Sequence, residues 1–152
     1  MTGSSTPEQR LVELGIRLPA PRTPAGHYRG WVRSGELLVL SGQGADGHTG
    51  RLGADLTVPA GYAAARACAL NLLAQTRAAL GTLDAVAQVL QLRGFVTSTA
   101  EFTDQPAVVD GASDLLVEIF GERGEHARTA IGVAALPRGF AVELDLTVRV
   151  HP

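Results

Sequence analysis

The chain has 152 residues, of which 13 are Lys or Arg and 15 are Asp or Glu, so its formal net charge at pH 7 is −2. This length fits a single domain whose folding removes roughly 68 to 70% of the unfolded chain's surface from water. Because the charge balance offers no excess of cations to a phosphate backbone, nucleic acid is not an expected partner.

Cysteine usage and hydropathy indicate where the protein works. Cys68 is the one cysteine of the sequence, which excludes an internal disulfide and fits a reducing compartment. No apolar run approaches about 18 residues, and the first six residues carry neither a basic start nor an apolar block. We therefore expect a cytoplasmic protein without a membrane segment.

Alanine and glycine abound while aromatic residues make up 5%, which suggests closely packed elements that leave surface for another subunit.

Periodicity and turn residues predict alternating helices and strands. In chain order these are a helix at 7–15, an extended connector at 18–24, a strand pair at 27–32 and 36–41, a glycine-rich loop at 42–58, a helix at 59–81, a strand at 85–96, a helix at 103–121, and a strand pair at 128–135 and 141–150. We expect an α+β fold, one domain spanning 1–152, in which a mixed sheet carries its two main helices on one face and residues 1–25 form an N-terminal extension.

The last twenty-five residues are predicted to form a hairpin, with a tight turn at Pro137-Arg138-Gly139. From Ala141 onward, apolar and polar residues alternate strictly, as in a half-buried strand. The strand before it alternates more weakly and is expected to place Ile131 on its apolar face. Arg128 and Glu143 would then leave the same, opposite face. A solvated strand face or a structural salt bridge would also account for this pair of charges.

Other candidate motifs favour neither a cofactor nor a metal. The loop Gly42-Gln43-Gly44-Ala45-Asp46-Gly47 matches the glycine pattern of dinucleotide sites, but turn-forming residues follow it where that motif requires a helix. What remains is a strand end whose backbone N–H groups can donate to a small anion or carbonyl. The four histidines lack metal-ligand spacing, and Cys68 lies among alanines, as expected of an inert packing residue.

The segment from Arg128 to Glu143 resembles the signature of the RidA family, also called YjgF or reactive intermediate deaminase. It has an arginine, small and aliphatic residues, Leu-Pro, and a glutamate fifteen positions after the arginine. Tyr28, followed by Ser41-Gly42-Gln43, is similar to the first strand pair of that family. The chain looks like a divergent, endoribonuclease-like branch.

The resemblance implies a chorismate-mutase-like fold, a homotrimer with clefts between subunits, and hydrolysis of 2-imino acids to 2-oxo acids and ammonia, without cofactor or metal. Arg128 would hold the substrate carboxylate, and Glu143 with Tyr28 would position water or move protons. The remaining expected substrate-binding residues are Ser41, Gly42, Gly111 and Ala130. The family's best-known branch has asparagine at Gly111 and cysteine at Ala130, which bears on substrate preference. A non-catalytic module that binds small carboxylates is the alternative, and a ribonuclease is a third hypothesis that the charge balance opposes.

The predicted hairpin has a geometric consequence for the site. If the turn centres on Arg138, Arg128 pairs near Val148 and Glu143 near Val133, which separates the two charges by about 16 Å. One small substrate cannot contact both within a chain. Either the register shifts at a bulge or the working pair comes from two subunits.

Overall fold

The computed structural model describes residues 3–152. The helices and strands are α1 (Pro7–Glu13), β1 (Trp31–Ser34), β2 (Leu37–Gln43), α2 (Val58–Leu80), β3 (Val86–Thr97), α3 (Gln105–Phe120), β4 (Ala127–Val133) and β5 (Val142–Val150), with short 3-10 turns η1 (Leu83–Ala85), η2 (Gly121–Gly124) and η3 (Pro137–Gly139).

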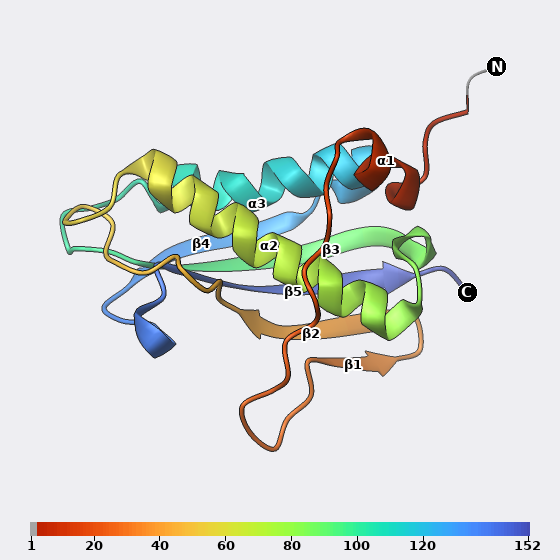
Figure 1. Cartoon of the computed structure of the whole chain (residues 1–152), viewed down its shortest axis with the longest axis horizontal. Coiled ribbons are helices and arrows are strands. Elements are labelled where there is room, and N and C mark those ends of the chain that lie inside the picture. The colour runs from red at the N-terminus through yellow and green to blue at the C-terminus, as the bar shows by residue number, and fades with distance from the viewer. Residues whose placement is uncertain (1–2) are drawn as a thin grey trace.

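The five strands form one sheet in the order β1-β2-β5-β3-β4. Strands β3 and β4 are parallel, and the other neighbours are antiparallel. Helices α2 and α3 lie side by side over one face, as Figure 1 shows, and we call the uncovered face the open face. The predicted mixed sheet with two main helices on one face is therefore confirmed.

The predicted C-terminal hairpin is wrong, because β4 and β5 are not neighbours. Strand β3 lies between them and pairs with both, parallel to β4 and antiparallel to β5. The segment Pro137–Gly139 is a 3-10 turn within a longer crossover that carries the chain from the sheet edge to its centre. The parallel neighbours β3 and β4 are joined by α3, since a parallel pair requires a crossover, whereas a tight turn after β4 would have made β4 and β5 antiparallel neighbours.

Alternation along β5 places its apolar residues against the helices. Val142, Leu144, Leu146, Val148 and Val150 are all buried, while the residues between them face the open side. Strand β4 is oriented opposite to expectation. Ile131 pairs with Phe95, which pairs with Glu143, so Ile131 lies on the open face and is 45% exposed. Small and apolar residues occupy both faces of this strand, so its pattern did not specify a side.

Local signals set the element boundaries. The Thr6 side chain and Gln9 form a reciprocal capping box at the start of α1. Gly81 ends α2 in the left-handed region, with φ 81°. Strand β1 begins at Trp31, four residues later than expected, because residues 27–30 bend toward β2. There the Ser41 hydroxyl donates to the Arg29 carbonyl at 2.5 Å. No helix within residues 3–152 combines the length and apolarity needed to cross a membrane.

Helices α2 and α3 approach each other closely at Gly111. A Cβ built there would lie 2.1 Å from the Tyr62 carbonyl oxygen and 3.2 Å from the Arg66 backbone nitrogen. Since both obstacles are backbone atoms, no rotamer change can relieve the overlap. Gly111, which we had expected to bind substrate, is thus placed between two helices, where it permits their contact.

We expect Gly111→Ala to destabilise the fold by about 2 kcal/mol, measured by urea unfolding. The clash costs up to about 3 kcal/mol, and the better helix propensity of alanine returns about 1 kcal/mol. Gly26→Ala is the matched control, because its Cβ would meet only the Tyr28 ring at 3.5 Å, an ordinary contact. Equal stability of the two variants would contradict the packing role of Gly111.

Candidate functional site

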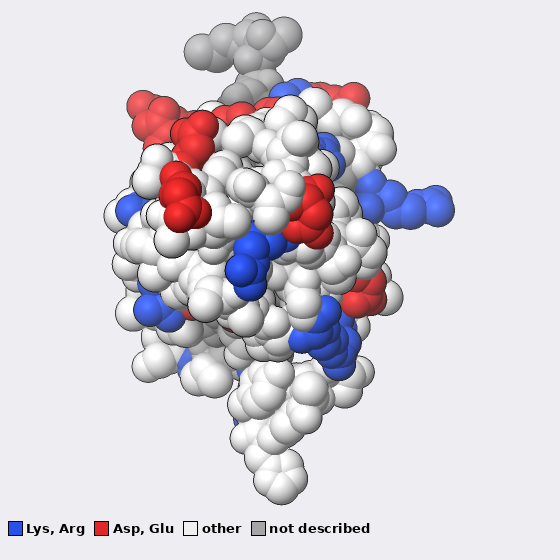
Figure 2. All heavy atoms as spheres, turned by 90° about the vertical axis from the view of Figure 1, so that its left-hand side faces the viewer, with Lys and Arg blue, Asp and Glu red and all other residues white. Residues whose placement is uncertain are grey.

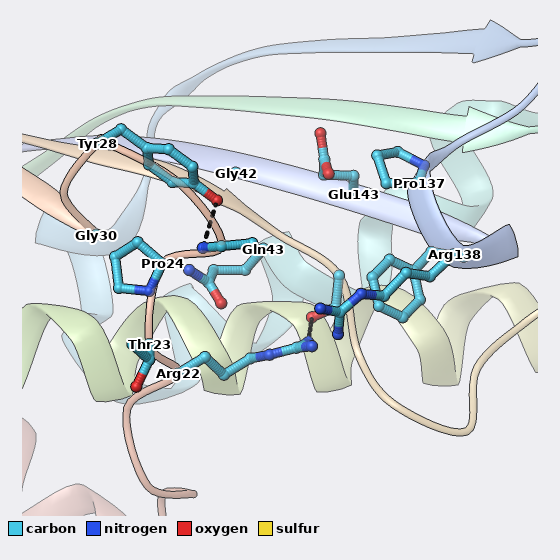
Figure 3. Close-up of a pocket in the computed structure, with 13 residues that line it drawn as sticks. Arg22, Thr23, Pro24, Tyr28, Gly30, Gly42, Gln43, Pro137, Arg138 and Glu143 are labelled. Atoms are coloured by element: carbon cyan, nitrogen blue, oxygen red, sulfur yellow. Dashed lines mark hydrogen bonds between the residues drawn. The ribbon is translucent and has the colours of Figure 1, made fainter.

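A small pocket lies where the connector between α1 and β1 crosses the end of β2. Its volume is about 160 Å³, close to the roughly 150 Å³ of a cavity that admits benzene. The residues used below are Arg22, Tyr28, Gly42, Gln43, Arg138 and Glu143. In Figure 3, Tyr28 enters the pocket from one side, and Glu143 and Arg138 from the other. We call it the Glu143 pocket.

Glu143 is the titratable acid of this pocket. It lies on the open face of β5 and is half-buried. Burial, with a smaller contribution from the nearby Asp145 carboxylate, raises the pKa of Glu143 above its usual value. Desolvation and a like charge both favour the protonated form. A carboxyl group of this kind exchanges protons closer to neutral pH than a solvated one, as acid–base chemistry requires.

Gly42, near the end of β2, and Gly44, directly after that strand, give the pocket its shape. A Cβ on Gly42 would lie 3.1 Å from the carboxyl carbon of Glu143, and one on Gly44 would lie 2.2 Å from the Phe140 ring. Gly47 adopts φ 80°, which glycine tolerates best. Packing and backbone conformation therefore account for the glycine pattern that resembled a nucleotide-binding motif.

The Tyr28 hydroxyl lies in the pocket as an available hydrogen-bond donor. The Tyr28 oxygen accepts a hydrogen bond from the Ala25 backbone N–H at 3.3 Å, and the side chain is 56% exposed. Its O–H remains available as a donor. Ser41, also an expected substrate-binding residue, uses its hydroxyl to fasten β2 to the connector at Arg29. Ser41 therefore supports the pocket without lining it.

Two arginines that sequence reasoning missed also line the pocket. Arg22 donates to the Gly44 carbonyl at 3.3 Å and to Asp46 at 3.2 Å, and its guanidinium lies 5.5 Å from the centre of the Phe140 ring. Arg138 is exposed, and no described residue forms a hydrogen bond or ion pair with it. One arginine lay in a proline-rich connector and the other in an expected turn, so no spacing signalled that they meet.

Arg128 lies on the other face of the sheet. It pairs with Leu92, which pairs with the buried Leu146, so its side chain rises on the side of the helices. There Nη1 donates to the Asp110 carboxylate at 2.7 Å and to the Ser113 hydroxyl at 3.2 Å. Within residues 3–152, Nε and Nη2 have no hydrogen-bond partner, so part of the guanidinium remains available.

The Ser113 hydroxyl is itself held by His126. Its oxygen lies 2.9 Å from Nε2 of His126, whose Nδ1 lies 2.6 Å from the Gly124 carbonyl oxygen. Because a carbonyl can only accept, Nδ1 carries the proton that it donates to Gly124. In the neutral ring, Nε2 then accepts from Ser113. This series of hydrogen bonds fixes the position of Ser113 beside Arg128.

The predicted site residues therefore form two groups. Tyr28, Gly42 and Glu143 meet in the pocket, whereas Arg128 and Ala130 lie on the helix-covered face of β4. The partners of Arg128 and Glu143 on β3 are three residues apart, which is about 10 Å along the sheet, and two strand spacings add about 10 Å across it. The hairpin estimate of their separation was wrong in its register, but one small ligand still cannot contact both within a chain.

Charges do not gather into a basic surface at the loop end of the molecule. Figure 2 shows separate arginine and acidic side chains set among uncharged atoms there. Within residues 3–152, no group of three or more His, Cys, Asp or Glu residues is placed to hold a metal ion. Burial raises the pKa of the Cys68 thiol to about 12, which leaves it protonated and unreactive at neutral pH.

Comparison with known proteins identifies the family. A family model described as "YjgF/chorismate mutase-like, putative endoribonuclease" matches residues 8–142. "Protein TCP17" of Trypanosoma cruzi is 51% identical over 147 residues, covering 93% of this chain and 92% of that protein. The Agrobacterium tumefaciens protein Atu1372, of unknown function, is 42% identical with a TM-score of 0.89, over 95% of this chain and 92% of that one. A RidA from Psychrobacter is 28% identical with a TM-score of 0.59, over 86% of this chain and 94% of that one. The chain therefore belongs to the YjgF/chorismate-mutase-like family, and a RidA protein is among its structural relatives.

Proposed function

We propose that the protein hydrolyses reactive 2-imino acids, and the enamines in equilibrium with them, to 2-oxo acids and ammonia. The observation that carries this proposal is the half-buried Glu143 carboxyl, whose pKa is raised and which lies against Gly42 in a small pocket that also contains the Tyr28 hydroxyl. Membership of a family that includes RidA supports it.

The proposed chemistry needs only a few groups. The carbon of a protonated imine is already electrophilic, so neither a covalent nucleophile nor a metal is required. Glu143 takes a proton from the attacking water and returns it to the nitrogen, after which the carbon–nitrogen bond breaks and ammonia leaves. The proton of the new hydroxyl group passes back to Glu143 as the carbonyl of the 2-oxo acid forms. Tyr28 donates its hydroxyl proton in a hydrogen bond to the substrate or to the water. A small, partly desolvated pocket strengthens these interactions.

The carboxylate of the substrate would be held by Arg128 of a neighbouring subunit in a homotrimer. Arg128 and Glu143 lie on opposite faces of one sheet, and β4 is an edge strand that a neighbour can approach. The unoccupied Nε and Nη2 of Arg128 match the two oxygens of a carboxylate. Apolar side chains on the open face, including the half-exposed Val39 and Ile131, favour assembly because burying them releases water.

A binding module without catalysis is the second candidate, favoured by the guanidinium groups that face the same pocket as Glu143. It would bind 2-oxo acids and release no ammonia from imines. Calorimetric titration with 2-oxobutanoate beside an ammonia assay with 2-iminobutanoate distinguishes the two functions.

Glu143→Gln should lower kcat for 2-iminobutanoate by at least about 100-fold, since it removes the group that accepts a proton from water. In the unaltered protein, kcat should fall as the pH drops through the raised pKa of Glu143, because the protonated carboxyl cannot act as a base. The acidic limb of the profile should lie above the ordinary glutamate pKa and be absent from the residual activity of the variant. Glu122→Gln, on the distant η2 turn, is the matched control. An unchanged profile in Glu143→Gln would refute the role.

Arg128→Ala should abolish turnover of 2-iminobutanoate, and mixing this variant with Glu143→Gln should restore part of it. If each site takes Glu143 from one subunit and Arg128 from the next, random mixing leaves about a quarter of the sites with both native residues, and about a quarter of the activity returns. Each variant alone is the control. No recovery in mixed trimers verified by native mass spectrometry would contradict a shared site.

RNA should not bind in a salt-dependent manner, although the family description names an endoribonuclease. The net charge of −2 opposes RNA binding, and on the face that Figure 2 shows the arginines are scattered among acidic and uncharged side chains. Fluorescence anisotropy with a single-stranded RNA at about 20 mM salt is the measurement. Binding that weakens linearly with the logarithm of salt concentration would instead support the ribonuclease hypothesis.

A further inference from the structure

We propose that Arg138 binds a second acidic group on the substrate, so that the Glu143 pocket prefers 2-imino dicarboxylates over monocarboxylates. The inference rests on the proposed function and refines it. Arg138 and Glu143 line the same pocket. A dicarboxylate can therefore place its carbon–nitrogen double bond near Glu143 and its far carboxylate on Arg138, while the near carboxylate faces Arg128 of the neighbouring subunit.

Of the two cations of this pocket, Arg138 is the one whose guanidinium is not engaged by other residues of the described chain. Arg22 is engaged by Asp46, by the Gly44 carbonyl and by the face of Phe140, contacts that tie the connector to the rest of the fold. Arg138 has no hydrogen-bond or ion-pair partner within residues 3–152. A guanidinium with all five donors available binds a carboxylate through two parallel hydrogen bonds.

The backbone conformation of Arg138 also supports a role in ligand binding. Its φ is 57°, and it is the one residue other than glycine with positive φ in the described chain. Glycine or asparagine adopts this conformation more easily, so local backbone energetics do not select arginine here. Strained positions of this kind cluster at ligand sites, where the surrounding structure holds them. At Arg138 the flanking Pro137, with its restricted φ, and Gly139, at φ 72°, hold the turn.

The pocket's charge balance explains why the ligand is acidic. Two guanidinium groups and one carboxyl line it, and Arg22 is already paired with Asp46, so Arg138 is the cation of the pocket whose charge is not balanced within residues 3–152. A neutral side chain on the substrate would leave Arg138 facing water. A carboxylate would replace that water with a charge-assisted pair of two parallel hydrogen bonds, which is stronger than a single hydrogen bond between neutral groups.

The test compares the two products, 2-oxoglutarate and 2-oxobutanoate, by calorimetric titration. The unaltered protein should bind 2-oxoglutarate about 10- to 100-fold more tightly, as expected of one added charge-assisted pair. Arg138→Gln should remove most of this preference. Arg138→Gly should remove it as well, yet unfold at a urea midpoint no lower than that of the unaltered protein, because glycine suits the positive φ. Arg123→Gln, an exposed arginine in another 3-10 turn, is the matched control and should retain the preference.

Kinetics with 2-iminoglutarate and 2-iminobutanoate, each generated in situ by an amino-acid oxidase, separates the two proposals. Arg138→Gln should lose at least tenfold more kcat/KM on the dicarboxylate than on the monocarboxylate. Absence of turnover with both imines, while the binding preference remains, would refute the deaminase and leave the Arg138 site standing. Equal affinity for the two oxo acids, or a preference that survives Arg138→Gln, would overturn the role of Arg138 whatever the activity.

Discussion

The site depends on the insertion of β5 between β2 and β3. This placement makes β5 the central strand, buries its five apolar side chains under α2 and α3, and leaves Glu143 on the open face beside the end of β2. Because side chains alternate along a strand, the same register places Arg128 on the helix-covered face, two strands away. One topological fact thus separates the two charges that the signature segment places fifteen positions apart.

Close backbone approaches convert this topology into a pocket. Gly42 lets the Glu143 carboxyl lie against the strand, and Gly44 admits the ring of Phe140, over which Arg22 lies. The connector is held to β2 by Ser41 and to α2 by the Gln75 amide, which donates to the Arg22 carbonyl at 2.8 Å. These hydrogen bonds hold a segment with little secondary structure of its own where it lines the Glu143 pocket.

Much of the fold could be predicted from the sequence, because its signals were local. Caps at Thr6 and Gly81, the stripe of buried residues on α3, and the alternation in β5 each depend on residues a few positions apart. Strand order is a non-local property, and Pro137-Arg138-Gly139 is compatible with either a hairpin or a crossover. The orientation of β4 was predicted wrongly for a related reason, because an edge strand with small residues on both faces has no clear alternation of apolar and polar residues.

The candidate site was only partly predictable for the same physical reason. Tyr28, Gly42 and Glu143 come together because the sheet register brings distant segments to one place, and the family signature encodes that register. Arg138 was assigned to a turn because its neighbours, Pro137 and Gly139, form turns. Nothing in a linear pattern reveals that its φ is positive or that its guanidinium has no hydrogen-bond or ion-pair partner among residues 3–152. Backbone strain and position in a pocket are properties of the folded chain, and together they distinguish Arg138 from the other exposed arginines.

In the proposed shared site, the open face is the surface through which copies of the chain would bring the two separated groups together. Its apolar side chains lie toward the two edges of the sheet, Leu37 and Val39 on β2 and Ile131 on β4, while Asp145 and Arg93 form a bidentate ion pair between them. Burying that ion pair in an assembly costs less than burying either charge alone, because each already satisfies the other. Copies of the chain that meet through this face would therefore bury the apolar residues without leaving a buried charge unpaired. They would also bring the sheet edge that carries Arg128 close to the Glu143 pocket of a neighbouring copy. In such an assembly, Arg128 of one copy and Glu143 of another would lie in one site, although a single sheet holds them on opposite faces.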